Sequence, residues 1–208
     1  MLIEILSGIA GVLYVILLTA ERRSCWLFGN LSVALLGYSC WEAGLYADMA
    51  LQGVYFAIGV VGYVNWTPTA ADRDKLHISR ISLRTGMLMT VVCIAGWIVV
   101  YQVLRMFPGS RLPMIDSLLF SCSLVATWFQ AKKYLENWLL WIPINLAYAA
   151  LYFSRDLPVY VGLSLVFATL SVRGLVQWKR ALRFTGEMSS QSLTVTELTK
   201  NKSNLPAS

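Results

Sequence analysis

Residues 2–20 read LIEILSGIAGVLYVILLTA, an apolar stretch with Glu4 as its one charged side chain. A helix needs about 20 predominantly apolar residues to cross the hydrocarbon core of a bilayer, so the stretch has the length and composition of a membrane span. It is longer than the apolar core of a secretory signal, and no cleavage pattern follows it. We therefore expect it to remain in the protein as the first span.

The rest of the chain has a similar composition. Of its 208 residues, 57% are apolar and 13% are charged, whereas soluble domains average about 45–50% apolar and about 25% charged. This excess excludes a soluble enzyme, a disordered scaffold and a nucleic-acid-binding domain, despite the net charge of +6. The sequence predicts an all-α polytopic membrane protein with seven transmembrane helices, at about 2–20, 25–44, 47–66, 85–104, 114–131, 137–153 and 157–178.

Two segments are more polar than the predicted spans. Residues 67–84 have a proline, Pro68, near their start and carry six charged side chains. We expect a surface linker or an interfacial helix there. Residues 185–208 are rich in Ser, Thr, Asn and Lys, a composition that predicts a disordered tail.

The distribution of Lys and Arg predicts the orientation. With seven spans, one side of the membrane carries 13 of the 17 basic residues and the other side carries Arg105, Arg111 and Arg155. Cytoplasmic loops are enriched in Lys and Arg. We therefore expect the N-terminus outside the cell membrane and the C-terminus on its cytoplasmic side. Arg173 lies within the last span, and its role is open.

Short motifs recur in corresponding spans. W-x-x-x-N occurs at 26–30 and 141–145, and G-x-x-[N/Q]-W occurs at 62–66 and 174–178. Chance similarity between Trp-rich spans is one explanation. The other is a pair of parallel three-helix repeats joined by a single helix, a 3+1+3 arrangement found among transporters. Its parts would be a first bundle at 1–66, a cytoplasmic linker at 67–84, a linker helix at 85–104, and a second bundle at 114–180.

Polar and aromatic residues inside the spans predict the functional site, because unpaired polar groups are costly in hydrocarbon. In the sixth span, Trp138, Trp141, Asn145 and Tyr148 share one helical face. A second stripe in the third span contains Gln52, Tyr55, Gly59, Gly62 and Trp66. With neighbouring spans added, the candidate substrate-binding residues are Asn30, Tyr38, Gln52, Tyr55, Trp128, Trp138, Trp141, Asn145 and Tyr148.

Such residues suit a flat, heteroaromatic, hydroxylated ligand, because rings stack on Trp or Tyr while amides hydrogen-bond polar substituents. The alternative is an interfacial aromatic belt with interhelical amide bonds, which we favour for Trp26, Trp66 and Trp178 because they lie near span ends.

His77 is the only histidine and no nucleotide-binding glycine motif occurs. We expect no catalysis, no metal and no cofactor. Few charges lie at depth, which favours facilitated diffusion over ion coupling.

The segments LYADMALQ at 45–52, YVNW at 63–66 and ENWLLW at 136–141, followed by Asn145, resemble the PnuC family of nicotinamide riboside transporters. The resemblance covers about residues 5–182. It implies a 3+1+3 fold similar to the SWEET proteins, a bacterial inner-membrane location and, in many members, a homotrimer.

The same resemblance implies facilitated diffusion of an unphosphorylated vitamin precursor that a cytosolic kinase then traps. Relatives of this kind carry thiamine and other vitamins or nucleosides, so the substrate is open within that class. A seven-helix sensor that binds a ligand without moving it is the alternative from another functional class.

Overall fold

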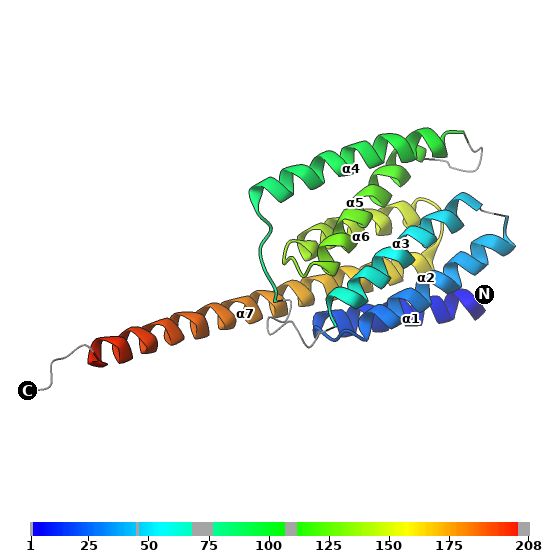
Figure 1. Cartoon of the computed structure of the whole chain (residues 1–208). Helices are drawn as coiled ribbons and strands as arrows, with labels where there is room; N and C mark the ends of the chain where they lie inside the picture. Colours follow the sequence, from blue (N-terminus) through cyan, green and yellow to red (C-terminus); the bar gives the residue numbers. More distant parts are fainter. Residues whose placement is uncertain (1, 45, 68–76, 107–111, 204–208) are drawn as a thin grey trace, which may run out of the picture.

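The computed structural model describes residues 2–44, 46–67, 77–106 and 112–203. Within these ranges the chain forms helices joined by short turns (Figure 1): α1 (Leu2–Thr19), α2 (Cys25–Glu42), α3 (Tyr46–Asn65), α4 (Leu83–Leu104), α5 (Pro113–Ala131), α6 (Asn137–Phe153) and α7 (Pro158–Ser203). Apart from the C-terminal end of α7, the helix boundaries lie within two residues of the predicted spans. The prediction of an all-α membrane protein is confirmed.

Among the described residues, four helices are long and apolar enough to cross a membrane by length and composition: α1, α4, α5 and the segment Pro158–Phe184 of α7. Of the others, α6 has 17 residues, and amide, glycine and aromatic side chains interrupt the aliphatic pattern of α2 and α3. These three helices each contribute to the central cavity described below.

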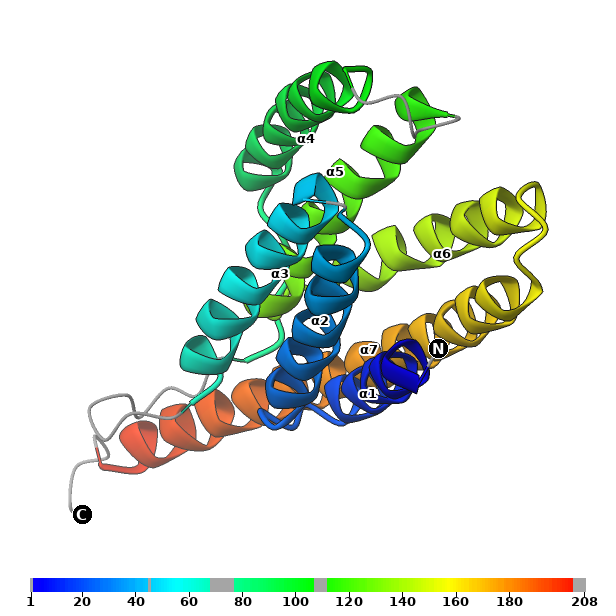
Figure 2. The same cartoon turned by 90° about the vertical axis from the view of Figure 1, so that its right-hand side faces the viewer.

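The helices pack as two groups that meet each other. α2 packs between α1 and α3, and α6 packs between α5 and α7. Between the groups, α1 contacts α7 and α3 contacts α5. If α1, α2 and α3 are exchanged with α5, α6 and α7, the α1–α7 contact becomes the α5–α3 contact. The packing of the two groups therefore has an approximate two-fold symmetry. α4 contacts α5 at one side of the bundle (Figures 1 and 2).

The turns of the two groups share a backbone conformation at a constant offset. Glu21 and Lys133, in the α1–α2 and α5–α6 turns, have φ of 54° and 53°. Gly44 and Asp156, after α2 and α6, have φ of 70° and 57°. Both pairs are separated by 112 residues. A left-handed φ is uncommon outside glycine, so two matched occurrences at one offset are evidence that the two groups share a local fold.

A tryptophan packed on a glycine recurs at the same offset. Trp26 lies so close to Gly62 that a Cβ on this glycine would overlap the indole, and Trp26 meets Trp66 edge to face with centroids 5.8 Å apart at 87°. The second group repeats these contacts with centroids 5.4 Å apart at 87°. The residues of the second set are Trp138, Gly174 and Trp178.

This recurrence corrects one sequence correspondence. The W-x-x-x-N motif pairs Trp26 with Trp141, which is 115 residues away. In the structure the counterpart of Trp26 is Trp138, 112 residues away, because it is Trp138 that packs on the second glycine and tryptophan. The two W-x-x-x-N motifs are therefore not structurally equivalent, whereas the two G-x-x-[N/Q]-W motifs are.

Residues 77–82, the described end of the predicted linker, are extended rather than helical. Ser79 N–H donates to the Lys133 carbonyl at 3.1 Å, and Leu135 N–H donates to the Ser79 carbonyl at 2.9 Å. The Glu136 carboxylate also accepts from Ile81 N–H at 3.0 Å. The remainder of the predicted linker, at 68–76, lies outside the described residues. The linker end is thus held against the α5–α6 turn.

The C-terminal segment differs from its prediction. α7 continues as a helix to Ser203 and projects from the bundle (Figure 1), where the composition from residue 185 predicts disorder. Residues 187–203 contain no proline or glycine, so nothing in that stretch interrupts a helix already started inside the bundle. The structure thus has a helix where the composition predicts a disordered tail, and that tail stays a prediction; residues 204–208 lie outside the described residues.

Candidate substrate cavity

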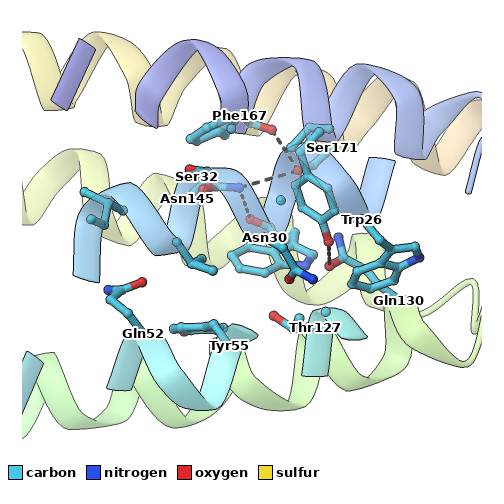
Figure 3. A pocket seen from close by; sticks show the side chains of 18 of the residues that line it. Trp26, Asn30, Ser32, Gln52, Tyr55, Thr127, Gln130, Asn145, Phe167 and Ser171 are labelled. Carbon is cyan, nitrogen blue, oxygen red and sulfur yellow. Dashed lines mark hydrogen bonds between the residues drawn. The ribbon is translucent and has the colours of Figure 1, made fainter. Parts of the chain in front are cut away.

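A cavity of about 290 Å³ lies between the two helix groups (Figure 3). Every helix except α4 contributes to its described lining. The lining is aromatic and uncharged: among the described residues it holds no Asp, Glu, Lys, Arg or His. Its aromatic members are Tyr14, Trp26, Tyr55, Trp138, Trp141 and Phe167, and its polar members with amide or hydroxyl groups also include Asn30, Ser32, Gln52, Thr127, Gln130, Asn145 and Ser171.

Asn145 lies on α6 with a side chain held by two hydrogen bonds. Its exposed fraction is 6%. Its Nδ2 donates to the Trp141 carbonyl at 2.9 Å and to Ser171 Oγ at 3.4 Å, and Ser171 Oγ donates in turn to the Phe167 carbonyl at 2.7 Å. Both amide hydrogens are engaged within the protein. Asn145 therefore presents Oδ1 as an acceptor to a ligand.

Gln130 on α5 is oriented in the opposite sense. Tyr14 Oη on α1 donates to Gln130 Oε1 at 2.9 Å (Figure 3), so the side-chain oxygen is engaged and the amide N–H groups remain as donors. Gln130 is 2% exposed. The bond joins the two helix groups across the cavity. One wall thus offers an acceptor and another offers donors, which is the pattern that a carboxamide or an imide can satisfy.

The α2–α3 wall depends on a close approach between helices. Gly59 faces Asn30, and a Cβ at this position would overlap Asn30 Oδ1. Asn30 can therefore lie against α3 beside Gln52 and Tyr55, which line the same side of the cavity (Figure 3). This explains why a glycine occurs within the polar stripe of the third span.

Four buried indoles close one end of the cavity. We call Trp26, Trp66, Trp138 and Trp178 the tryptophan cluster; their exposed fractions are 2%, 7%, 0% and 0%. Trp26 and Trp138 also line the cavity, so the cluster forms its floor beside the α1–α2 and α5–α6 turns. The interfacial-belt interpretation of Trp26, Trp66 and Trp178 is wrong, because these side chains pack on one another between helices rather than facing a membrane interface.

The structure brings together six of the nine candidate residues: Asn30, Gln52, Tyr55, Trp138, Trp141 and Asn145 all line the cavity. Helical periodicity is sufficient for these because each shares a face with another polar or aromatic residue at similar depth. Their contact with a ligand stays a prediction, since the lining position is what the structure establishes.

Three candidate residues do not line the cavity. Tyr38 is 50% exposed and donates to Glu42 Oε1 at 2.6 Å, beyond the cavity along α2. Trp128 lies under Lys132, whose Nζ is 5.2 Å from its ring centroid. Tyr148 stacks on Tyr152 with centroids 5.8 Å apart at 17°. The structure therefore does not bring these three residues into the cavity lining, and their contact with a ligand stays a prediction.

Tyr14, Thr127, Gln130, Phe167 and Ser171 line the cavity but are absent from the predicted set. Gln130 follows Thr127 by three positions, so an amide on the same face as a hydroxyl was a usable signal. Tyr14 is the single aromatic residue of the first span. Phe167 and Ser171 had no distinguishing pattern in the sequence, because phenylalanine and serine are common in membrane helices.

The helical bundle is that of a polytopic membrane protein, with an uncharged, aromatic-lined cavity between its two helix groups of the kind that binds small molecules in other proteins. Residues 1–180 match the model of the nicotinamide mononucleotide transporter family, and the chain belongs to that family of membrane transporters.

Individual relatives agree with this membership. The nicotinamide riboside transporter PnuC of Escherichia coli K12 is 24% identical over 209 residues, covering 88% of this chain and 87% of the relative. PnuC of Neisseria mucosa is 26% identical over 190 residues, covering 85% and 72%. The riboflavin/roseoflavin transporter RibM of Streptomyces davaonensis is 23% identical over 162 residues, covering 76% of each chain.

A solved structure has the same fold. The crystal structure of the vitamin B3 transporter PnuC superposes with a TM-score of 0.68 at 25% identity, covering 87% of this chain and 82% of that chain. The similarity extends over nearly the whole helical bundle, so the cavity lies in the part of the chain shared with that transporter.

Proposed function

We propose that this protein carries nicotinamide riboside across the bacterial inner membrane by facilitated diffusion, without changing the substrate chemically. The uncharged aromatic cavity with oriented amides is the observation that supports it. The relatives named nicotinamide riboside transporters add to the case. A cytosolic kinase that phosphorylates the incoming riboside would keep uptake running downhill.

The chemistry of the riboside matches the cavity. Its ring is an N-alkylated pyridinium, a flat cation that stacks favourably on indole and phenol faces; Trp138 and Trp141 supply such faces. Its carboxamide has both a donor and an acceptor. Asn145 Oδ1 would accept from the amide hydrogens, and the Gln130 N–H groups would donate to the amide oxygen. Asn30 and Gln52 remain for the ribose hydroxyls.

The cavity also discriminates against a phosphate. A phosphate leaving water needs cationic or multiple N–H partners to replace its hydration. The described lining contains no Lys or Arg. We therefore propose that the unphosphorylated riboside, rather than the mononucleotide, is the transported species.

The two helix groups, α1–α3 and α5–α7, are proposed to be parallel repeats joined by α4. The 112-residue offset of the turns and tryptophans supports this arrangement. The distribution of Lys and Arg supports a periplasmic N-terminus and a cytoplasmic C-terminus. With this proposed orientation, the tryptophan cluster would lie at the cytoplasmic end of the bundle. Assembly as a homotrimer follows from the family resemblance, and native mass spectrometry of the detergent-solubilised protein tests it.

Uptake by purified protein in sealed liposomes tests the proposed function. Labelled nicotinamide riboside should equilibrate across the membrane without an ion gradient, and protein-free liposomes supply the background. Nicotinamide mononucleotide should neither enter nor compete. Riboside that binds but never equilibrates would identify a sensor instead of a transporter.

Riboflavin is a second candidate substrate, because RibM is a relative that carries it. A flavin is also flat, heteroaromatic and hydroxylated, and it has an imide in place of the carboxamide. Parallel uptake of labelled riboflavin, thiamine and a deoxynucleoside separates these possibilities. Uptake of riboflavin and not of the riboside would replace the proposed substrate while leaving the transport function in place.

A further inference from the structure

The two helix groups are connected at the tryptophan cluster by a small set of contacts. Glu21 Oε2 and Lys133 Nζ, from the α1–α2 and α5–α6 turns, form an ion pair at 3.1 Å. The same Lys133 Nζ lies 4.6 Å from the ring centroid of Trp66. Trp66 and Trp178 meet at 6.0 Å, and Trp178 Nε1 donates to the Leu18 carbonyl at 3.3 Å. Each of these contacts joins one group to the other.

The contacts within each group are of a different kind. The Trp26–Trp66 and Trp138–Trp178 pairs are edge-to-face at 87°, and the first tryptophan of each pair sits directly on a glycine of its own group. Close packing of this sort holds the two indoles of one group together as a unit. A separation of the two groups would therefore divide the cluster between Trp66 and Trp178, and would leave both pairs intact.

The closed cluster leaves polar groups without partners. Three of its four indole N–H groups, those of Trp26, Trp66 and Trp138, have no hydrogen-bond partner in the part of the chain that the structure describes. A buried donor without an acceptor is unfavourable compared with the same donor in water. Separating the groups would hydrate these indoles, so the closed arrangement depends on contacts between the groups to remain closed.

The cavity and the ion pair are linked through one turn. Gln130, which lines the cavity and accepts from Tyr14, also accepts at its carbonyl from Lys133 N–H at 3.0 Å. Gln130 therefore belongs both to the cavity lining and to the turn that carries Lys133. The extended segment at residues 77–82 is hydrogen-bonded to the same turn.

We propose that the Glu21–Lys133 ion pair is a latch between the two helix groups, which holds the tryptophan cluster closed beneath the cavity and must open to release substrate on that side. The proposal rests on the proposed transport function. Its specific content is that these two side chains, 112 residues apart at equivalent turns, set how often the cavity opens toward the cluster.

Thiol labelling tests the latch without any substrate. The four native cysteines are replaced, Thr127→Cys introduces a single thiol in the cavity lining, and a membrane-impermeant maleimide is added from the cluster side of sealed vesicles. Glu21→Lys, which turns attraction into repulsion, should speed labelling about fivefold. The reversed pair, Glu21→Lys with Lys133→Glu, should bring the labelling rate back toward that of the parent.

A matched ion pair provides the control. Arg155 and Asp116 pair at 2.8 Å among the helix ends far from the cluster, so Arg155→Glu should leave labelling from the cluster side unchanged. Unchanged labelling in Glu21→Lys, an equal effect of Arg155→Glu, or no recovery in the reversed pair would each overturn the latch. Because labelling needs no substrate, a failure of riboside uptake would count against the proposed function alone.

Discussion

Glu21 and Lys133 occupy equivalent turns of the two helix groups, share a left-handed φ of 54° and 53°, and bind each other at 3.1 Å. A residue and its repeat counterpart can contact each other only near the axis that relates the two groups. The ion pair therefore marks that axis at the end of the bundle where the tryptophan cluster lies. The two turns thus share a backbone conformation while carrying side chains of opposite charge.

Asn145→Ala should weaken riboside binding, because the variant removes the acceptor that we place against the substrate carboxamide. Loss of one buried hydrogen bond costs about 1–3 kcal/mol, which corresponds to a roughly tenfold to hundredfold weaker affinity. Asn137→Ala is the matched control: Asn137 is a buried asparagine on the same helix that donates to the Tyr134 carbonyl at 2.6 Å and does not line the cavity. Calorimetric titration of the purified variants measures both. Equal affinities in the two variants would remove Asn145 from the site.

Gly59→Ala should impair uptake, because the added Cβ overlaps Asn30 Oδ1 and must displace Asn30 or α3. Overpacking of this kind costs about 1–3 kcal/mol. Gly53→Ala, on the same helix, has open space at its Cβ and should transport normally. Liposome uptake at matched protein levels compares the two. Normal uptake by Gly59→Ala would show that α3 need not approach Asn30 closely.

Trp178→Phe should be less stable than Trp138→Phe by about 1 kcal/mol. Both indoles are 0% exposed and contact each other, so the loss of volume is similar. Trp178 alone of the two donates a hydrogen bond, to the Leu18 carbonyl. Thermal unfolding in detergent without substrate measures the difference. Equal melting temperatures would mean that this hydrogen bond contributes nothing net.

Oxidation should join α4 to α5 through Cys93 and Cys122. Their Sγ atoms are 3.7 Å apart, a gap that modest side-chain rotation reduces to the roughly 2.05 Å of a disulfide. Treatment with Cu(II)–phenanthroline in air, in which two Cu(II) ions each accept one electron and dioxygen reoxidises them, followed by peptide mass mapping detects the bond. Cys122→Ser is the control and should give no cross-linked peptide. Failure of the native pair to cross-link would place α4 away from α5.

Much of the fold follows from the sequence because hydrophobic length is a local property. A run of about 20 apolar residues must satisfy its own backbone in lipid, and a helix is the way a single segment does so. Hence the predicted spans match α1 to α6 within two residues. The helical end of α7 does not follow from the sequence, because polar composition beyond Phe184 predicts exposure to water and does not by itself say where a helix stops.

The candidate site was predictable only in part, because a sequence pattern describes one helix and not how that helix packs against its neighbours. Periodicity shows which side chains share a face of one helix, and this was enough for Gln52 with Tyr55 and for Trp141 with Asn145. It does not show at what depth that face meets a neighbouring helix. Tyr148 shares the α6 stripe yet stacks on Tyr152 outside the cavity.

The sequence by itself determined that the chain crosses a membrane as a bundle of helices with amides and aromatic rings turned inward, because apolar length and helical period are both written along a single segment. Only the tertiary structure decided that Trp138 is the counterpart of Trp26, that Tyr14 orients Gln130, and that Glu21 reaches Lys133. Those relationships join residues more than a hundred positions apart, and they depend on how two helix groups dock, which no local pattern specifies.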